Sequence, residues 1–170
     1  EKFNIEIVPL SISIEGKTYI DDENLDREQL LADMKKSDST PKTASPAPNS
    51  FLEKFKKAEN AFVVTLSSKL SGTFQNASLA RRMVEDLEDK FIHVFDSLSA
   101  SAGETMVSFK IGELLEKGLD KEKIVEKINN YIDEMKTMFV LDSLDNLIKA
   151  GRIGKIKGRL ASMLNIKPVM

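Results

Sequence analysis

Two short apolar runs, each followed by a hydroxyl-rich loop and then a helical pattern, restrict the fold more than any other feature of the sequence. The runs Ala61–Val64 and Phe91–Phe95 are too short and too rich in valine and phenylalanine for helices, so we predict strands there. Helical spacing follows from Phe74 to Leu87, and again after the second loop as far as Lys117. Strands that alternate with helices predict an α/β fold with a largely parallel sheet flanked by helices.

The rest of the chain is predicted to add short elements around this unit. We expect a bent strand over Phe3–Ile14 and then a hairpin turn at Gly16. Asp26 and Asp120 are predicted to cap helices, and the Ser/Thr/Pro-rich segment Ser37–Pro48 is predicted to be a loop without regular structure. The last expected elements are a strand over Thr137–Leu141 and two short helices over Leu144–Ala150 and Ile156–Leu164.

The pattern near Lys136 predicts a domain boundary, because the periodicity changes there and glycine and basic residues become more frequent. We therefore expect an N-terminal α/β domain over residues 1–136 and the beginning of a second, truncated α/β domain over residues 137–170. The sequence begins inside a strand pattern, so we also expect that the first strand of the N-terminal domain is missing.

Composition excludes several kinds of site. The 170 residues, 41% hydrophobic and 31% charged, are typical of a globular protein with a real core. Without cysteine there is no thiolate ligand or Cys nucleophile, and the one histidine, His93, leaves little for transition-metal chemistry, so we expect no metal and no cofactor. A net charge of −2 gives no drive toward nucleic acid. With no apolar run of the ~18 residues that a membrane span needs and no leader pattern, a cytoplasmic location is expected.

The segment Thr65–Thr73 is the strongest candidate for a binding site. It places hydroxyl groups, backbone N–H groups and Gly72 at the start of a predicted helix, which suits an anion. Lys69 precedes Gly72, whereas the lysine of a P-loop follows its last glycine, so a carboxylate or neutral polar group fits better than a triphosphate. The alternative interpretation is that Ser71 and Thr73 only cap the helix.

Three further groups of residues each have a functional and a structural interpretation. Thr43 lies in a proline-restricted loop that can hold a hydroxyl rigidly, or in an ordinary turn. A hydrolytic triad of Ser71, His93 and Asp96 is disfavoured because the Gly-x-Ser-x-Gly pattern is absent. A basic cluster around Arg152 can dock an acidic partner or meet anionic lipid, or it is a solvated linker; its cations are Lys149, Arg152, Lys155, Lys157 and Arg159. Met83, Met106, Met135, Met138 and Met163 are predicted to lie in the core or to line an acyl tunnel.

Four ordered motifs together make the chain resemble the DegV family of bacterial fatty-acid-binding proteins. They are Thr43-Ala44-Ser45-Pro46-Ala47-Pro48, Leu70-Ser71-Gly72-Thr73, Asp96-Ser97 with Ser101 and Gly103, and Gly151-Arg152-Ile153-Gly154. The resemblance extends over essentially the whole chain. Ser45 stands where members commonly have glutamine.

The resemblance implies a two-domain α/β protein that holds one long-chain fatty acid in a tunnel between its domains. Some members present the carboxylate to a separate fatty acid kinase subunit, so the expected role is that of a carrier rather than an enzyme, with no catalytic residue. By the family's pattern Thr43 and Ser71 hydrogen-bond the carboxylate, aided by the backbone at Gly72. Thr73, Ser97 and Ser101 are then candidate pocket-lining residues, and Arg152 is a candidate contact for the kinase partner.

Two other functions stay open at this point. A small-molecule phosphotransferase would use the Ser71 loop for phosphate, but it would need a metal-binding carboxylate pair that Asp96 alone does not supply. A protein-interaction module would use the basic cluster and would bind its partner in a salt-sensitive way. Transient contact with a membrane surface is also compatible with the basic cluster.

Overall fold

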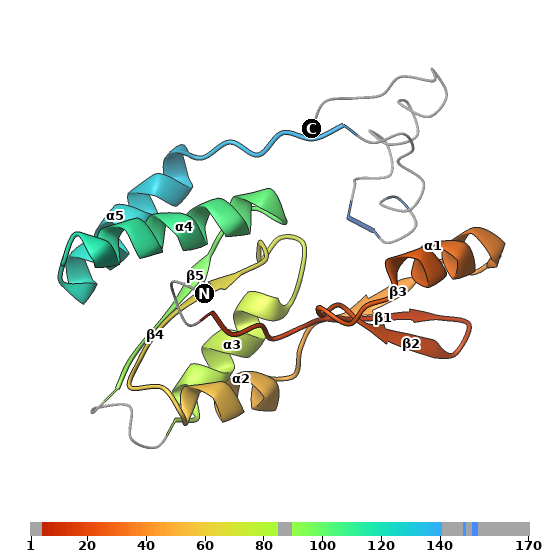
Figure 1. The fold of residues 1–170 in the computed structure, drawn as a ribbon, viewed down its shortest axis with the longest axis horizontal. Coiled ribbons are helices and arrows are strands. Elements are labelled where there is room, and N and C mark those ends of the chain that lie inside the picture. The colour runs from red at the N-terminus through yellow and green to blue at the C-terminus, as the bar shows by residue number, and fades with distance from the viewer. Residues whose placement is uncertain (1–4, 85–89, 141–147, 149–150, 153–170) are drawn as a thin grey trace. The chain divides into compact units, whose positions relative to one another are not determined.

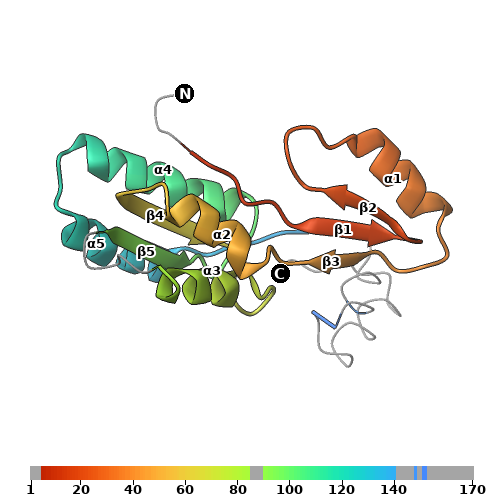
Figure 2. The ribbon, with the colours of Figure 1, turned by 90° about the horizontal axis from the view of Figure 1, so that it is seen from below.

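The computed structural model describes residues 5–84, 90–140, 148 and 151–152 of the chain. Its residues group into two compact units, one formed by residues 1–8 and 45–136 and the other by residues 9–44 and 137–170. Figures 1 and 2 show the elements of each unit. The division into domains 1–136 and 137–170 stays a prediction, because it concerns the longer protein that the family resemblance implies.

The larger unit is built on two parallel strands, β4 (Asn60–Thr65) and β5 (Phe91–Asp96). The register pairs Val63 with Val94 and Val64 with Phe95. Helices cover both faces of this sheet, which explains why the strands are apolar at successive positions rather than at every second one (Figure 1). This arrangement confirms the predicted α/β class, with β4 and β5 as its described parallel pair.

Each face of the sheet has its own core. On one face, α2 (Pro48–Phe55) and α3 (Thr73–Arg82) pack against side chains that include Val63 and Ile92. On the other face, α4 (Ala102–Glu116) and α5 (Lys121–Glu134) pack against Phe62, Val64 and Phe95. The helix that we predicted to end before Gly118 does so: Gly118 has φ +69°, which a glycine adopts without strain.

The smaller unit contains a three-stranded antiparallel sheet in the order β2-β1-β3, formed by β1 (Ser11–Ile14), β2 (Lys17–Ile20) and β3 (Lys42–Ala44). The predicted turn is confirmed, since Gly16 has φ +84° between the paired residues Ile14 and Lys17. Helix α1 (Arg27–Lys36) buries Leu30 with Ile14 and Tyr19. Asp26 caps α1 by accepting a hydrogen bond from the Gln29 N–H at 2.9 Å.

Several sequence predictions were wrong in detail. The strand expected over Phe3–Ile14 is regular only from Ser11, and the loop expected over Ser37–Pro48 contains β3, which pairs with β1. No strand forms over residues 137–139, and Val140 makes only an isolated bridge. Ile148 is helical, while the rest of Leu144–Ala150 is largely outside the described residues and Ile156–Leu164 wholly so.

The methionine prediction holds only in part. Met83, Met106 and Met138 are exposed rather than buried, whereas Met135 packs against the α4–α5 core. Met163 lies outside the described residues. In the part of the chain that the structure describes, every helix is too short or too polar to cross a membrane.

Candidate functional site

The loops after β4 and β5 lie side by side at the carboxyl ends of the two strands, as the parallel arrangement predicts (Figure 1). The Ser67 N–H donates to the Ser99 carbonyl at 2.8 Å, and the Ser97 N–H donates to the Thr65 carbonyl at 3.2 Å. The buried Thr65 hydroxyl adds a 2.9 Å bond to the Phe95 carbonyl. The loop after β4 is therefore fixed against the loop after β5.

Asp96 connects the two loops through its carboxylate. Oδ1 accepts a 3.0 Å bond from the Ser68 N–H and a 3.2 Å bond from the Leu98 N–H. Leu98, the donor of the second bond, has φ +50°, a backbone conformation that residues other than glycine rarely adopt. The sequence placed Asp96 at the end of a strand but gave no indication of this bridging role.

Ser71 and Thr73 form a pair of hydroxyl groups on either side of Gly72, the N-cap residue of α3. The two hydroxyl oxygens are 2.8 Å apart, and Ser71 Oγ also accepts a 3.3 Å bond from the Thr73 N–H. Ser71 is half-buried and Thr73 is buried at 7% exposure. The structural interpretation is thus partly correct, because Ser71 does satisfy a backbone N–H group at the helix start.

Ser45 and Asn76, which the sequence analysis did not select, meet beside this pair. The Asn76 side chain donates from Nδ2 to Ser45 Oγ at 3.1 Å and to the Pro46 carbonyl at 2.8 Å. A Cβ atom added at Gly72 would stand 3.4 Å from Ser45 Oγ, so the Ser45 hydroxyl lies against the N-cap of α3. Asn76 is separated from Gly72 by one helical turn, and that spacing is the only signal in the sequence that could have found it.

The loop from Ser97 to Ser101 is tightly packed. Ser97 is fully buried, and its hydroxyl both accepts from the Ser99 N–H at 3.1 Å and donates to the Ser99 carbonyl at 3.3 Å. Ser101 is exposed at the N-cap of α4 with φ +53°, and its N–H donates to Glu104 at 3.0 Å. Burial raises the pKa of Glu104, which this hydrogen bond opposes. The assignment of Ser97 and Ser101 as pocket-lining residues stays a prediction.

Thr43 lies in the smaller unit, on β3, where it is exposed and pairs with Ile12 across the ladder. Ser71 lies in the larger unit. The structure therefore describes the two predicted carboxylate ligands separately, each in its own surroundings.

The three side chains weighed as a hydrolytic triad have other contacts. Ser71 bonds Thr73, and Asp96 bonds backbone N–H groups. The His93 and Phe95 rings pack together, with their centroids 4.5 Å apart. The pKa of His93 is lowered by burial and, to a lesser extent, by the charge of Arg81. These contacts agree with the structural interpretation of His93 as a packed side chain.

The basic cluster is described only at Arg152, which is exposed. Lys149, Lys155, Lys157 and Arg159 lie outside the described residues. Among the described residues, no three histidine, cysteine, aspartate or glutamate side chains are grouped so that they could hold a metal ion.

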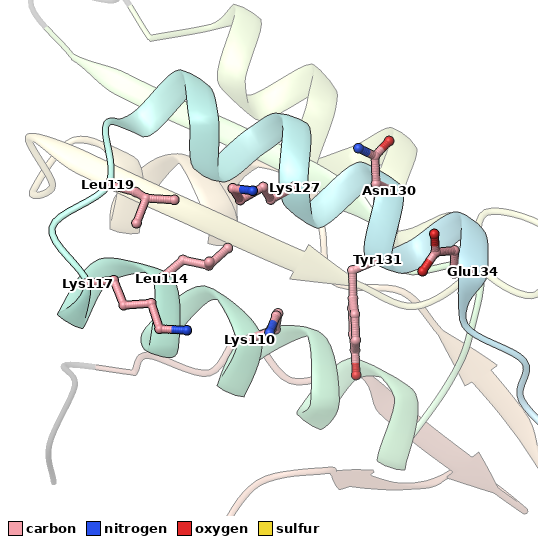
Figure 3. A pocket seen from close by; sticks show the side chains of 8 residues that line it. All are labelled: Lys110, Leu114, Lys117, Leu119, Lys127, Asn130, Tyr131 and Glu134. Atoms are coloured by element: carbon pink, nitrogen blue, oxygen red, sulfur yellow. The ribbon is translucent and has the colours of Figure 1, made fainter.

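A pocket of about 560 Å³ lies away from these loops, between α4 and α5 (Figure 3). Its rim carries Lys110, Lys117 and Lys127 around Leu114 and Tyr131, and its remaining lining residues are Leu119, Asn130 and Glu134. Glu113 binds both Lys110 and Lys117, at 2.8 and 2.5 Å, so two of these cations are already paired. None of the predicted site residues lines this pocket.

Comparison with known proteins agrees with the motifs. The family model described as "Uncharacterised protein, DegV family" matches residues 1–170. A DegV domain-containing protein of Streptococcus pneumoniae is 39% identical over 163 residues, which are 95% of this chain and 58% of that protein. The chain thus spans about three fifths of the length of the curated relatives it matches.

Two solved structures show the same fold with a bound fatty acid. The fatty acid kinase (Fak) B3 protein of Streptococcus pneumoniae, loaded with linoleic acid, is 38% identical with a TM-score of 0.88 over 95% of this chain and 58% of that chain. A DegV family protein of Ruminococcus gnavus, refined with vaccenic acid, is 41% identical with a TM-score of 0.83 over 86% of this chain and 53% of that chain.

Proposed function

Because the chain belongs to the DegV family, we propose that its protein binds one long-chain fatty acid and presents the carboxylate to a separate kinase subunit. The kinase subunit forms the acyl phosphate, and the protein described here is the carrier rather than the enzyme. The fatty acids bound to structural neighbours support the proposal that the ligand is a fatty acid. One of these neighbours is a fatty acid kinase protein, which supports the proposal that the partner is a kinase subunit.

The hydroxyl pair at the start of α3 is the observation that carries this proposal. A carboxylate removed from water must keep its hydrogen bonds, and it accepts them from hydroxyl and N–H groups. Ser71 Oγ already accepts from the Thr73 N–H, and with Thr73 as donor in the 2.8 Å hydroxyl pair, the Ser71 proton is left for the ligand. Such a chain of hydrogen bonds strengthens its last donor. The backbone at Gly72 is proposed to help.

Thr43 is the second proposed ligand of the carboxylate, and chain connectivity supports its role. Ser45 is fixed to Asn76, and Thr43 precedes Ser45 by two residues. Two residues of extended chain span about 7 Å at most, whatever the placement of the two units. Thr43 is exposed on its strand, so solvent and a ligand can reach the residue.

The alkyl chain is proposed to supply most of the binding energy. Each methylene removed from water contributes roughly 0.8 kcal/mol, so a dozen of them exceed a headgroup hydrogen bond of about 1–3 kcal/mol. The headgroup residues then fix where the carboxylate points. Changes at Ser71 should impair presentation to the kinase more than retention of the lipid.

The remaining assignments are parts of the same proposal. Ser97 and Ser101 shape the pocket, and Arg152 contacts the kinase subunit or, transiently, a membrane surface. Residues 1–136 and 137–170 belong to two domains that enclose the acyl chain. The protein carries out this role in the cytoplasm. Arg152 is exposed in the structure.

Mass spectrometry of organic extracts tests the proposal. We expect near-stoichiometric fatty acid in the purified full-length protein and similar lipid content in Ser71→Ala. Kinase-dependent formation of acyl phosphate should be reduced by roughly tenfold or more in Ser71→Ala, since a hydrogen bond to a charged group contributes about 1.5–3 kcal/mol. Ser78→Ala, a hydroxyl removal further along α3, is the matched control.

A lipid-free extract from protein that also takes up no added fatty acid would contradict the carrier function. Phosphate esters in that extract would favour the phosphotransferase alternative. Normal lipid content with unchanged phosphorylation in Ser71→Ala would keep the carrier but remove Ser71 from the headgroup site.

A further inference from the structure

The side-chain amide of Asn76 has a defined orientation because of its neighbours. The Pro46 carbonyl can only accept a hydrogen bond, so the Asn76 atom 2.8 Å from it must be the NH2 group. The same nitrogen is 3.1 Å from Ser45 Oγ. Since an amide NH2 group is a donor without acceptor capacity, Ser45 Oγ accepts, and the Ser45 proton is directed to another acceptor.

Asn76 is itself held by the helix. Its N–H donates to the Gly72 carbonyl at 3.0 Å, which places Asn76 one turn into α3. The Ser45 hydroxyl lies against Gly72, and Ser71 and Thr73 are the neighbours of Gly72 along the chain. All of these residues belong to one compact unit.

From these contacts we infer that Ser45 is a further donor to the fatty acid carboxylate and that Asn76 is the positioning residue that orients it. The inference rests on the proposed function and adds two residues to its headgroup site. The hydroxyl groups of Ser45 and Ser71, both at Gly72, then point their protons to the ligand. Each hydroxyl oxygen accepts a hydrogen bond from a fixed donor, Asn76 Nδ2 for Ser45 and the Thr73 N–H for Ser71. A carboxylate has the acceptor capacity for both.

Binding measurements on the full-length, delipidated protein distinguish this role from a merely structural one. Hexadecanoic acid and hexadecan-1-ol are compared as competitors of a fluorescent fatty acid, because a hydrogen bond to a charged acceptor is worth more than one to a neutral acceptor. Ser45→Ala and Asn76→Ala should weaken binding of the acid roughly tenfold, but binding of the alcohol no more than about threefold.

Two further variants sharpen the test. Ser45→Thr keeps the hydroxyl and suits the extended backbone before a proline, so it should bind the acid as the parent does. The double variant Ser45→Ala/Asn76→Ala should bind the acid no more weakly than whichever single variant has the lower affinity, since Asn76 acts through Ser45. Ser78→Ala on the same helix, with melting temperatures of all variants, controls for general loss of stability.

The outcomes separate this inference from the function on which it depends. If the parent binds the acid but Ser45→Ala weakens acid and alcohol equally, or Ser45→Thr binds as poorly as Ser45→Ala, Ser45 is structural and the inference is wrong. Additive losses in the double variant would overturn the positioning role of Asn76. A parent protein that binds no fatty acid overturns both the proposed function and this inference.

Discussion

Asp96 connects the two loops of the candidate site. Its carboxylate satisfies N–H groups in two loops, at Ser68 and at Leu98. Asp96→Ala leaves both without this acceptor, and we expect a loss of about 1–3 kcal/mol in the free energy of unfolding. Urea unfolding measures it. Asp96→Asn retains an acceptor oxygen and should lose less; an equal loss in both variants would show that the negative charge, rather than the two hydrogen bonds, is what matters.

His93 makes a prediction about pH at the same scale. Burial and the charge of Arg81 lower its pKa below 6.5 in the folded protein. The unfolded chain therefore takes up a proton that the folded chain resists, so stability is complete above pH 6.5 and falls as the pH drops from 6.5 toward the lowered value. His93→Gln should flatten this part of the curve of unfolding free energy against pH. An unchanged slope in the variant would assign the pH dependence to other groups.

Among the elements, α4 owes its position to Gly103. A Cβ atom there would stand 1.9 Å from Ser99 Oγ and 2.5 Å from Ser99 Cβ, so the helix start or the loop would have to move. We expect Gly103→Ala to destabilise the protein by about 1–3 kcal/mol, as overpacking does. Thermal unfolding measures the loss. Adding Ser99→Gly removes both colliding atoms and should recover part of it, whereas strictly additive losses would exclude the collision as the cause.

The elements that could be predicted from sequence are those with a strong local period. β4, β5 and the helices after them follow from apolar spacing alone. The strand expected over Phe3–Ile14 is shorter because Pro9 lacks an N–H group for a ladder, and Val8 packs against the α2–α3 core instead. β3 was missed because its three residues are exposed and take their strand form from pairing with β1, about thirty residues earlier.

The candidate site, like the fold, was predictable only in part. That the loops after two parallel strands would meet followed from the fold, and the Ser67–Ser99 contact confirms it. The bridges of Asp96 to Ser68 and of Asn76 to Ser45 join residues 28 and 31 positions apart. Such contacts are decided by tertiary packing, which no local period encodes, and so sequence reasoning missed them.

On the scale of the whole molecule, each of the two units has its own acid-sensitive carboxylate. In the smaller unit, hydrogen bonds from Lys17, then Tyr19 and Gln29, lower the pKa of Asp33 from 3.8 to about 2. In the larger unit, Lys110 and Lys117 lower the pKa of Glu113 from 4.5 to about 2. Both groups favour the folded state when ionised. Their stabilisation is complete above about pH 4.5 and is lost as the pH falls toward 2.

Acid titration of the melting temperature therefore tests both units together. The parent should lose stability between about pH 4.5 and 2, and Asp33→Asn and Glu113→Gln should each start lower at neutral pH and fall less steeply. Because Glu113 is exposed and Asp33 is only partly buried, salt should reduce the difference between parent and variants. Glu122→Gln, which removes an exposed carboxylate from α5, controls for the change in net charge. If all three variants keep the slope of the parent, acid unfolding is driven by overall positive charge, and the two local networks contribute nothing measurable to it.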